Sequence, residues 1–303
     1  MENKLVSIVI PTYSRPENLC RAIDSVLAQT YSPIEILVVD DNGVGTEYQL
    51  ETEKVLESYI KKGKITYLKH EVNKNGSAAR NTGSRASHGE YIGYLDDDDI
   101  FLPTKIEKQV LRLQMASAKD PKVQASYCNI FMEGYEKSNY ILRSSLEGNL
   151  AEPLLMGEIR FNSSTILMSR EAYNTINGWD ERFLRHQDWE FCTRYFSKFK
   201  MVNACADECL VKKYNTPNFN TANPDKVARN MEFFLCEMKA YIDNLQRKNE
   251  IYSFRYMGLS RTYFQNRDFK NGRKYLNEVG KYRSITFSDY FNILKSIIKS
   301  ISK

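Results

Sequence analysis

The sequence is poor in the residues that form nitrogen and sulfur metal clusters, and it has no long apolar run. Histidine occurs three times in 303 residues, and the six cysteines form no Cys-x-x-Cys pair. A structural zinc site is therefore not expected. No stretch approaches the roughly eighteen apolar residues of a membrane-spanning helix, and the beginning of the chain lacks the pattern of a signal peptide. These absences favour a cytoplasmic protein with reduced thiols.

The net charge is small and unevenly distributed. Forty-three basic residues against 38 acidic ones give +5, which does not indicate a nucleic-acid partner. Between residue 270 and the end of the chain, eight basic residues face two acidic ones, so this segment carries +6. With 42% hydrophobic residues the chain can bury a core, and we expect a globular body with a basic C-terminal segment.

Short apolar runs alternate with helical patterns in the first third of the chain. Strands are expected at Leu5–Pro11, Ile34–Asp40, Lys64–Lys69 and Tyr91–Leu95. Helices are expected between them at Pro16–Thr30, Glu47–Lys61 and Gly76–Ser87. This alternation predicts βαβ units and a mostly parallel sheet, with ligand-binding loops at the carboxyl ends of the strands.

The remainder of the chain is less regular and then becomes helical. Strands are expected at Val123–Phe131, Thr165–Met168 and Met201–Tyr214, and a helix at Asp188–Phe199. From Pro224 onward every pattern is helical, including a helical hairpin over Arg255–Gly280. An α/β domain followed by a helical region is therefore predicted.

Four consecutive aspartates, Asp96–Asp99, follow the fourth expected strand. Adjacent carboxylates repel one another and require a counter-charge. Mg²⁺ and Mn²⁺ prefer oxygen ligands and are commonly held by one or two carboxylates together with substrate phosphates. A solvated acidic turn is the alternative, but the position at the carboxyl end of a buried strand favours a metal site.

Three further segments carry residues suited to binding or to acid–base chemistry. Asp40 and Asp41 end the second strand, where a carboxylate can bind a base or a ribose or close an ordinary turn. Arg80 lies one turn into a helix that opens with small residues, where it can bind a diphosphate; small residues also mark close helix–sheet packing. Asp188 heads the inward face of a helix, and an inward carboxylate is costly unless it is used, although a helix start also favours an acid.

The order of these motifs resembles the family 2 glycosyltransferases of GT-A fold. The likeness covers roughly residues 5–215, and five motifs in one order are far more specific than any one of them. The segments that carry it are Val6–Tyr13, Val38–Asn42, Ala79–Gly83, Leu95–Asp99, and Gly178–Glu181 together with Gln187–Glu190.

The resemblance implies a fold, a domain organisation and a reaction. The fold would be α/β, with a Rossmann-like, mostly parallel sheet flanked by helices over residues 1–215. Residues 1–110 would bind the nucleotide sugar, residues 111–215 the acceptor, and residues 216–303 would form a helical C-terminal region. The reaction would be an inverting, metal-dependent transfer from a nucleotide sugar, most often a UDP-hexose or UDP-N-acetylhexosamine. The acceptor would be a hydroxyl of a glycan or lipid-linked glycan, as in surface polysaccharide synthesis.

Residue roles follow from the same resemblance. Asp96 and Asp98 occupy the acidic positions of the family's Asp-x-Asp element and would hold Mn²⁺ or Mg²⁺. Asp98 would be the direct ligand, with Asp97 or Asp96 toward the ribose or a metal-bound water. Asp188 falls where the family keeps its catalytic base. Asp41 would bind the base, and Arg80 the base or the diphosphate. The nucleotide pocket would contain Pro11, Thr12, Tyr13, Arg15, Asp41, Arg80 and Asp97. Residues 160–164 and the loop 179–187 are expected on the acceptor side.

Two positions depart from the family pattern, and two alternative functions stay open. Gln187 stands where the family commonly has an acid, and no histidine follows His186 to serve as a further metal ligand. The alternatives are a catalytically idle nucleotide-sugar-binding subunit of a synthesis complex, and a nucleotidyltransferase. The presence of both Asp98 and Asp188 argues against the idle subunit. The loop at residues 12–16, with one arginine and no glycine, argues against the nucleotidyltransferase.

Residues 285–303 have the pattern of an amphipathic helix. Its lysines, Lys295, Lys299 and Lys303, lie on one face and suit an anionic membrane surface. Packing on the body or on a second copy of the chain is the equal alternative, and the oligomeric state stays open. We therefore expect a cytoplasmic enzyme that is either free or peripheral at the cytoplasmic face of the membrane. The expected apolar stripe comprises Phe287, Tyr290, Phe291, Leu294, Ile297, Ile298 and Ile301.

Overall fold

The computed structural model describes residues 3–134, 139–214 and 223–301, and the chain divides into two compact units. The first unit comprises residues 1–151 and 159–217, and the second comprises residues 152–158 and 218–303. The boundary expected after residue 215 falls within residues 215–222, outside the described residues. Residues 152–158 belong to the second unit, a feature that no sequence pattern indicates.

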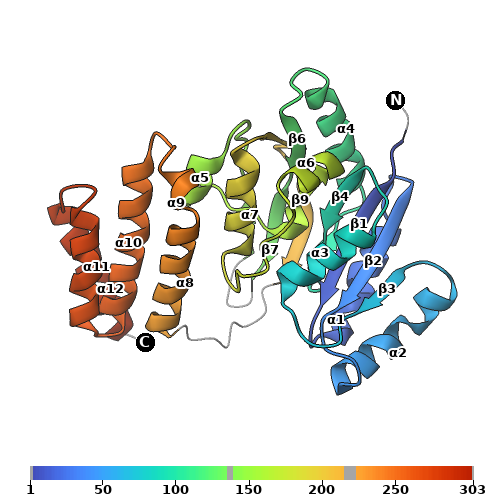
Figure 1. Ribbon diagram of the computed structural model, residues 1–303, viewed down its shortest axis with the longest axis horizontal. Coiled ribbons are helices and arrows are strands. Elements are labelled where there is room, and N and C mark those ends of the chain that lie inside the picture. Colours follow the sequence, from blue (N-terminus) through green and yellow to red (C-terminus); the bar gives the residue numbers. More distant parts are fainter. Residues whose placement is uncertain (1–2, 135–138, 215–222, 302–303) are drawn as a thin grey trace. The chain divides into compact units, whose positions relative to one another are not determined.

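The first unit contains two sheets with helices around them (Figure 1). The larger sheet is formed by β1 (Val6–Thr12), β2 (Ile34–Asp40), β3 (Thr66–Lys69), β4 (Tyr91–Tyr94), β6 (Val123–Tyr127), β9 (Ile166–Ser169) and β10 (Lys200–Asn203). The smaller sheet is formed by β5 (Asp99–Phe101), β7 (Asn129–Glu133), β8 (Tyr140–Leu142) and β11 (Cys209–Tyr214). The helices are α1 (Pro16–Leu27), α2 (Glu47–Lys61), α3 (Gly76–Ala86), α4 (Lys105–Ser117), the 3₁₀ turn η1 (Ser163–Thr165), α6 (Arg170–Thr175) and α7 (Gln187–Phe196).

The larger sheet has the strand order β10-β6-β9-β4-β1-β2-β3, and all its pairings are parallel except those of β9. The ladders align Thr12 with Asp40 and Val9 with Tyr94, so the segments that follow β1, β2 and β4 emerge at one edge. Because β9 runs against its neighbours, the turn η1 that precedes it lies at this same edge. The mostly parallel sheet with flanking helices confirms the predicted α/β fold class.

Helices cover both faces of the larger sheet. Ile8 and Ile10 of β1 belong to one apolar core with Leu19 of α1, Leu56 of α2 and Val110 of α4. Because successive side chains of a strand point to opposite faces of the sheet, the residues between them in β1 face the other side, where α3 packs.

The small residues of α3 allow this helix to lie unusually close to the sheet. A Cβ atom added to Gly83 would come within 2.3 Å of Val9 Cγ1 and 3.1 Å of Val39 Cγ2. Glycine is therefore required here by close packing, whatever ligand the neighbouring residues bind.

The first four predicted strands and three predicted helices are present, with ends shifted by a few residues. Two other predicted strands were wrong, because each is a pair of strands that belong to different sheets. Residues 123–131 form β6 and then β7, and residues 201–214 form parts of β10 and all of β11. A chain that changes sheet keeps its apolar pattern, so periodicity does not reveal the break. The helix α4 and the short strand β5 were not predicted.

The second unit is helical, as predicted, and contains α8 (Pro224–Glu237), α9 (Lys239–Ile242), α10 (Lys248–Gln265), α11 (Phe269–Gly280) and α12 (Phe287–Ile301). All of the helix α5 (Ala151–Leu155) except its first residue falls within residues 152–158 of this unit. Arg247 binds this segment at both ends: its backbone N–H donates to Glu152 Oε1 at 3.0 Å, and its Nη1 is 2.9 Å from Glu158 Oε1. Arg255 Nη2 donates to the Leu154 carbonyl at 3.1 Å. Among the residues that the structure describes, no helix combines the length and apolar character needed to cross a bilayer.

Candidate active site

A cavity of about 250 Å³ lies at the edge of the larger sheet where β1, β2 and β4 end. All seven residues predicted to form the nucleotide pocket line it, together with one aspartate of the predicted metal pair. They come from three strand ends and from α3. The fold thus brings these residues to one place, and the binding role of each stays a prediction. The lining consists of Pro11, Thr12, Tyr13, Arg15, Asp41, Gly76, Ala79, Arg80, Asp96 and Asp97.

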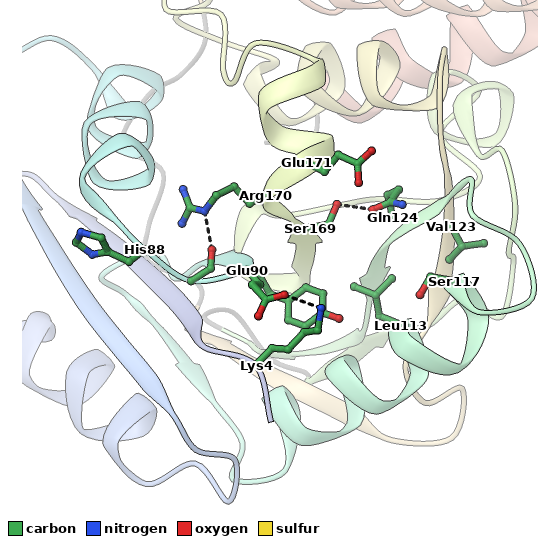
Figure 2. A pocket seen from close by; sticks show the side chains of 12 residues that line it. Lys4, His88, Glu90, Leu113, Ser117, Val123, Gln124, Ser169, Arg170 and Glu171 are labelled. Carbon is green, nitrogen blue, oxygen red and sulfur yellow. Dashed lines mark hydrogen bonds and ion pairs between the residues drawn. The ribbon is translucent and has the colours of Figure 1, made fainter. Parts of the chain in front are cut away.

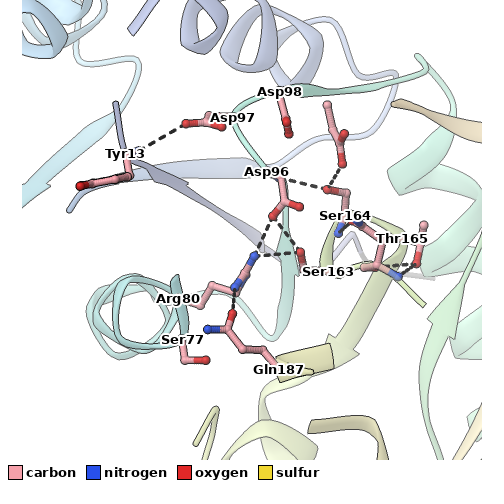
Figure 3. Close-up of polar contacts among 12 residues, drawn as sticks. Tyr13, Ser77, Arg80, Asp96, Asp97, Asp98, Ser163, Ser164, Thr165 and Gln187 are labelled. Atoms are coloured by element: carbon pink, nitrogen blue, oxygen red, sulfur yellow. Dashed lines mark hydrogen bonds and ion pairs between the residues drawn. The ribbon is translucent and has the colours of Figure 1, made fainter. Parts of the chain in front are cut away.

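Asp96 lies at the centre of a polar network (Figure 3). Its Oδ1 accepts from Arg80 Nη2 at 2.7 Å and from Ser163 Oγ at 2.8 Å. Its backbone N–H donates to Ser164 Oγ at 3.0 Å. The two serines, from the segment predicted to lie on the acceptor side, thus contact the four consecutive aspartates Asp96–Asp99, which we call the acidic cluster. Burial disfavours charge on Asp96, but Arg80 and then Lys213 outweigh burial and hold the pKa of Asp96 well below its ordinary value.

Arg15 binds the next two aspartates. Its Nη2 is 2.9 Å from Asp97 Oδ1, and its Nη1 donates to Asp98 Oδ2 at 2.5 Å. Thr12 Oγ1 donates to Asp97 Oδ2 at 2.9 Å, and the Tyr13 backbone N–H lies 3.4 Å from the same oxygen. Burial raises the pKa of Asp97 to about 7, although Arg15 and Thr12 act in the opposite direction. Asp97 therefore ties the loop after β1 to the acidic cluster.

The fourth aspartate, Asp99, pairs with a lysine that no sequence motif indicated. β11 is antiparallel to β5 and aligns Lys213 with Asp99. Lys213 Nζ is 3.0 Å from Asp99 Oδ1, 3.7 Å from Asp98 Oδ1 and 3.8 Å from Asp96 Oδ2. Burial disfavours the ammonium, but Asp96, Asp99 and Asp98 outweigh it and raise the pKa of Lys213. Sequence reasoning missed Lys213 because the contact depends on a strand pairing across 114 residues.

The acidic cluster has the donor set of a hard divalent cation. Carboxylate oxygens of Asp96, Asp98 and Asp99 lie within 4.8 Å of one another, and an all-oxygen set of this kind fits Mg²⁺ or Mn²⁺. The group contains both aspartates predicted to hold the ion and adds Asp99. The chain itself also supplies the counter-charge that adjacent aspartates require. Arg15 pairs with Asp98, Lys213 with Asp99, and Arg80 with Asp96.

Arg80 connects α3 to α7 as well as to the acidic cluster. Its Nη1 donates to Gln187 Oε1 at 3.2 Å, and its guanidinium carbon lies 5.0 Å from the centre of the Trp179 ring. Gln187 Nε2 in turn donates to the Phe183 carbonyl at 2.9 Å. The residue that departs from the family pattern, Gln187, is therefore used to position the arginine.

Asp41 is fully engaged by the loop that precedes α3. Its Oδ1 accepts from His70 Nδ1 at 2.7 Å and from the Lys74 backbone N–H at 2.8 Å. Its Oδ2 accepts from Asn73 Nδ2 at 3.0 Å and from the Asn75 backbone N–H at 2.8 Å. Asp41 thus fixes one wall of the cavity, and its contact with a base stays a prediction.

The start of α3 does not offer free amides to an anion at its first positions. Asn75 Oδ1 accepts from the backbone N–H groups of Ser77 and Ala78, at 2.9 Å and 3.3 Å. Asn75 thus caps α3, and these two amides are already used within the chain. The cation available to a diphosphate on this helix is Arg80.

Asp188 lies in the first turn of α7, where the family resemblance places the catalytic base. Its Oδ1 is buried and has no hydrogen-bond partner among the described residues. Burial raises the pKa of Asp188 to about 6, with Arg80 opposing and Asp96 adding to the shift. These interactions place the carboxylate beside the acidic cluster. A buried carboxylate with a free oxygen and a pKa near neutrality is suited to accept a proton.

A second cavity, of about 350 Å³, lies at the opposite edge of the same sheet, and the contacts of Arg170 in its wall stabilise the fold (Figure 2). Arg170 occupies its wall, and all three guanidinium nitrogens are used: Nε donates to the Gly89 carbonyl, Nη1 to the Ser84 carbonyl and Nη2 to Ser87 Oγ. These bonds fasten the turn between α3 and β4. The residues predicted to bind the nucleotide sugar lie at the carboxyl ends of the strands instead.

Similarity to known proteins identifies the family of the chain. Residues 7–176 match the family model described as glycosyl transferase family 2. The chain belongs to this family. An uncharacterized glycosyltransferase of Rickettsia conorii is 35% identical over 213 residues, which is 69% of this chain and 33% of that protein. The chain thus matches about a third of the length of this relative. The amylovoran biosynthesis glycosyltransferase AmsB of Erwinia amylovora is 26% identical over 84% of this chain and 83% of its own length.

Solved structures of glycosyltransferases share the fold. TarS of S. aureus in complex with UDP-GlcNAc has a TM-score of 0.65 and 16% identity, covering 91% of this chain and 80% of that chain. The mannosyltransferase PcManGT of Pyrobaculum calidifontis, in complex with GDP-Man and Mn²⁺, has a TM-score of 0.59 and 13% identity, covering 100% of this chain and 87% of that chain. The GT-A fold predicted from the sequence is confirmed.

Proposed function

We propose that this family member transfers a hexose or N-acetylhexosamine from a UDP-sugar to a hydroxyl of a glycan acceptor, with inversion and with help from Mn²⁺ or Mg²⁺. The observation that carries the proposal is the meeting of three elements at one edge of the sheet. Asp188 on α7, Arg80 on α3 and the acidic cluster after β4 interact electrostatically with one another. A base, a diphosphate-binding cation and a metal-binding group are the parts that such a transfer requires.

Each residue has one task in the proposed reaction. Asp188 accepts the proton of the acceptor hydroxyl as its oxygen forms a bond to the anomeric carbon. The bond from that carbon to the diphosphate oxygen breaks on the opposite face, and the electron pair leaves with UDP. Arg80 stabilises the charge that grows on the diphosphate. Asp96, Asp98 and Asp99 would hold the divalent cation, which when bound neutralises further diphosphate charge.

One relative supports a role in polysaccharide synthesis, and two structurally similar glycosyltransferases guide the choice of donor. AmsB is named for amylovoran biosynthesis, and we propose a surface polysaccharide or a lipid-linked precursor as the acceptor class. TarS is described with UDP-GlcNAc and PcManGT with GDP-Man. We take UDP-sugars as the first donors to test and GDP-mannose as the comparison.

Release of the nucleoside diphosphate across a donor panel, with and without Mn²⁺, tests the proposal. We expect one donor to be hydrolysed slowly without acceptor, and this activity to be lost in Asp98→Ala. Asp188→Asn is expected to retain donor binding and to lose turnover. NMR analysis of the product's anomeric configuration checks inversion once an acceptor is found. Donor binding without any turnover, in the presence of glycan acceptors, would favour the idle binding subunit, and release of pyrophosphate from a nucleoside triphosphate would favour the nucleotidyltransferase.

We propose in addition that α12 docks on an anionic membrane surface at the cytoplasmic face. One stripe of this helix is exposed, with exposed fractions from 49% at Phe291 to 86% at Phe287. The adjoining side packs inward through Ile293, which belongs to a core with Met257 and Val279. An apolar face that remains exposed after the helix has packed, beside Lys295, matches an interfacial helix. The side chains of residues 299 and 301 and all of Lys303, which the sequence pattern also included, lie outside what the structure describes.

Co-sedimentation with vesicles tests this docking. The full chain should bind vesicles that contain phosphatidylglycerol, bind pure phosphatidylcholine weakly, and be released by salt. The double substitution Phe287→Ser and Leu294→Ser should abolish binding. Leu50→Ser on α2, which changes a similarly exposed side chain (58% against 53% for Leu294), is the matched control. A concentration-dependent dimer that Phe287→Ser and Leu294→Ser dissociate, with no vesicle binding, would show that a second copy covers this face instead.

A further inference from the structure

Lys213 contacts the three aspartates that could hold a divalent cation. Its ammonium lies 3.0 to 3.8 Å from oxygens of Asp99, Asp98 and Asp96. The same three residues provide the oxygens that lie close enough together to hold one ion. The three aspartates that bind the ammonium are thus the same three that could bind a metal ion. The register of β11 against β5, which places Lys213 opposite Asp99, makes this arrangement part of the fold.

We propose that the Lys213 ammonium and the divalent cation are alternative occupants of this carboxylate group, so that ion binding displaces Lys213. The inference rests on the proposed metal-dependent transfer, and it assigns to Lys213 a role that the aspartates alone do not suggest. In the absence of the ion, Lys213 neutralises the cluster and keeps the buried Asp99 paired. When the ion is bound, the lysine leaves and the same oxygens become ligands.

Charge and mobility both support exchange rather than joint occupancy. Two cations at separations of a few ångströms repel strongly even with the screening typical of proteins. Arg15 pairs with only Asp98 of these three aspartates and with Asp97 outside the group, and Arg80 pairs with Asp96 while Ser163 and Gln187 also hold it. Lys213 carries its charge on a flexible four-carbon chain, and its side chain is 24% exposed, so it has a path to water.

Direct measurement of Mn²⁺ binding tests the exchange without any need for activity. Mn²⁺ alone is titrated into the full chain, and the free ion is followed by electron paramagnetic resonance. Lys213→Met removes the competing charge at similar volume, so we expect it to bind Mn²⁺ at least about tenfold more tightly than the wild type. Lys212→Met is the matched control: the neighbouring side chain points to the other face of β11, where its Nζ is 3.0 Å from Glu133 Oε2. It should bind Mn²⁺ as the wild type does.

Chemical labelling of the wild type provides a second test that does not depend on the variant's folding. Lysine acetylation by a small reagent, read by mass spectrometry, should increase at Lys213 when Mn²⁺ is added and stay constant at Lys212. Equal Mn²⁺ affinity in Lys213→Met and wild type, or no change in labelling at saturating Mn²⁺, would overturn the exchange while leaving the metal site in place. If neither protein bound Mn²⁺, the exchange would be wrong together with metal dependence, and metal-free turnover of a UDP-sugar would show that the transferase function stands.

Discussion

The carboxylate proposed as the base should make the folded protein less stable at neutral pH. Burial raises the pKa of Asp188 to about 6, whereas an exposed aspartate titrates near about 3.9. Each pKa unit corresponds to about 1.4 kcal/mol, so the ionised Asp188 lowers the free energy of unfolding by about 1–3 kcal/mol above pH 6. Asn cannot ionise. Asp188→Asn should therefore be more stable than the wild type at pH 8 by this amount, although it turns over poorly.

The raised pKa of Asp188 determines how the stability difference between Asp188→Asn and the wild type depends on pH. Below about pH 4, Asp188 is neutral in the folded and the unfolded chain, and the two proteins should be equally stable. The advantage of Asp188→Asn should grow between about pH 4 and pH 6, where the unfolded wild type loses its proton more readily than the folded one. Above pH 6 it should be constant.

Urea unfolding followed by tryptophan fluorescence measures this difference. The two tryptophans, Trp179 and Trp189, both lie in the first unit, so the signal reports on the unit that contains Asp188. Asp180→Asn is the control: burial disfavours charge on Asp180, but Arg182, whose Nη2 is 2.7 Å from Asp180 Oδ2, outweighs it and lowers the pKa. This control should lose stability or stay unchanged at pH 8. Equal stability of Asp188→Asn and wild type at pH 8, or an advantage that persists at pH 4, would refute the reasoning.

Three further outcomes are expected. Turnover should fall about tenfold per pH unit below pH 6 and be level above it, because Asp188 must be ionised to accept a proton; a profile level down to pH 4.5 would contradict its role as base. Gly83→Ala should reduce the free energy of unfolding by about 1–3 kcal/mol, because the new Cβ would meet Val9 Cγ1 at 2.3 Å; urea unfolding checks this, and an unchanged midpoint would mean that α3 can move away. Arg80→Lys should lower turnover at least about tenfold, because an ammonium cannot replace the planar fork that contacts Asp96 and Gln187 and that we propose to bind the diphosphate; UDP release measures the effect, and unchanged turnover would exclude this role of Arg80.

Much of the site could be predicted from the sequence because its residues follow strands directly. Asp41 and Asp96 stand one and two residues after β2 and β4. Parallel strands bring their carboxyl ends to one edge, so order along the chain was enough to group these residues with Arg15 and Arg80. Asp188 required the family resemblance in addition, since a helix-start acid has an ordinary explanation.

Lys213 shows the limit of this reasoning. A strand late in the chain carries two adjacent lysines, Lys212 and Lys213, and only the register with β5 decides which one meets Asp99. That register depends on β5, a three-residue strand too short to give a periodic signal. The break of residues 123–131 and 201–214 between two sheets escaped prediction for a related reason, because an apolar pattern does not record a change of partner.

The discontinuous second unit limits how the chain can be divided. A chain shortened to end at residue 217 would keep the whole sequence of the first unit and would also keep residues 152–158. Those residues would lose Arg247 and Arg255, which bind Glu152, Glu158 and the Leu154 carbonyl. A fragment chosen to isolate the first unit would therefore carry, in the middle of its sequence, a segment without its hydrogen-bond and ion-pair partners. Grafting this C-terminal region onto another member of the family would therefore require replacement of two separate stretches of chain, one at residues 152–158 and one after residue 217.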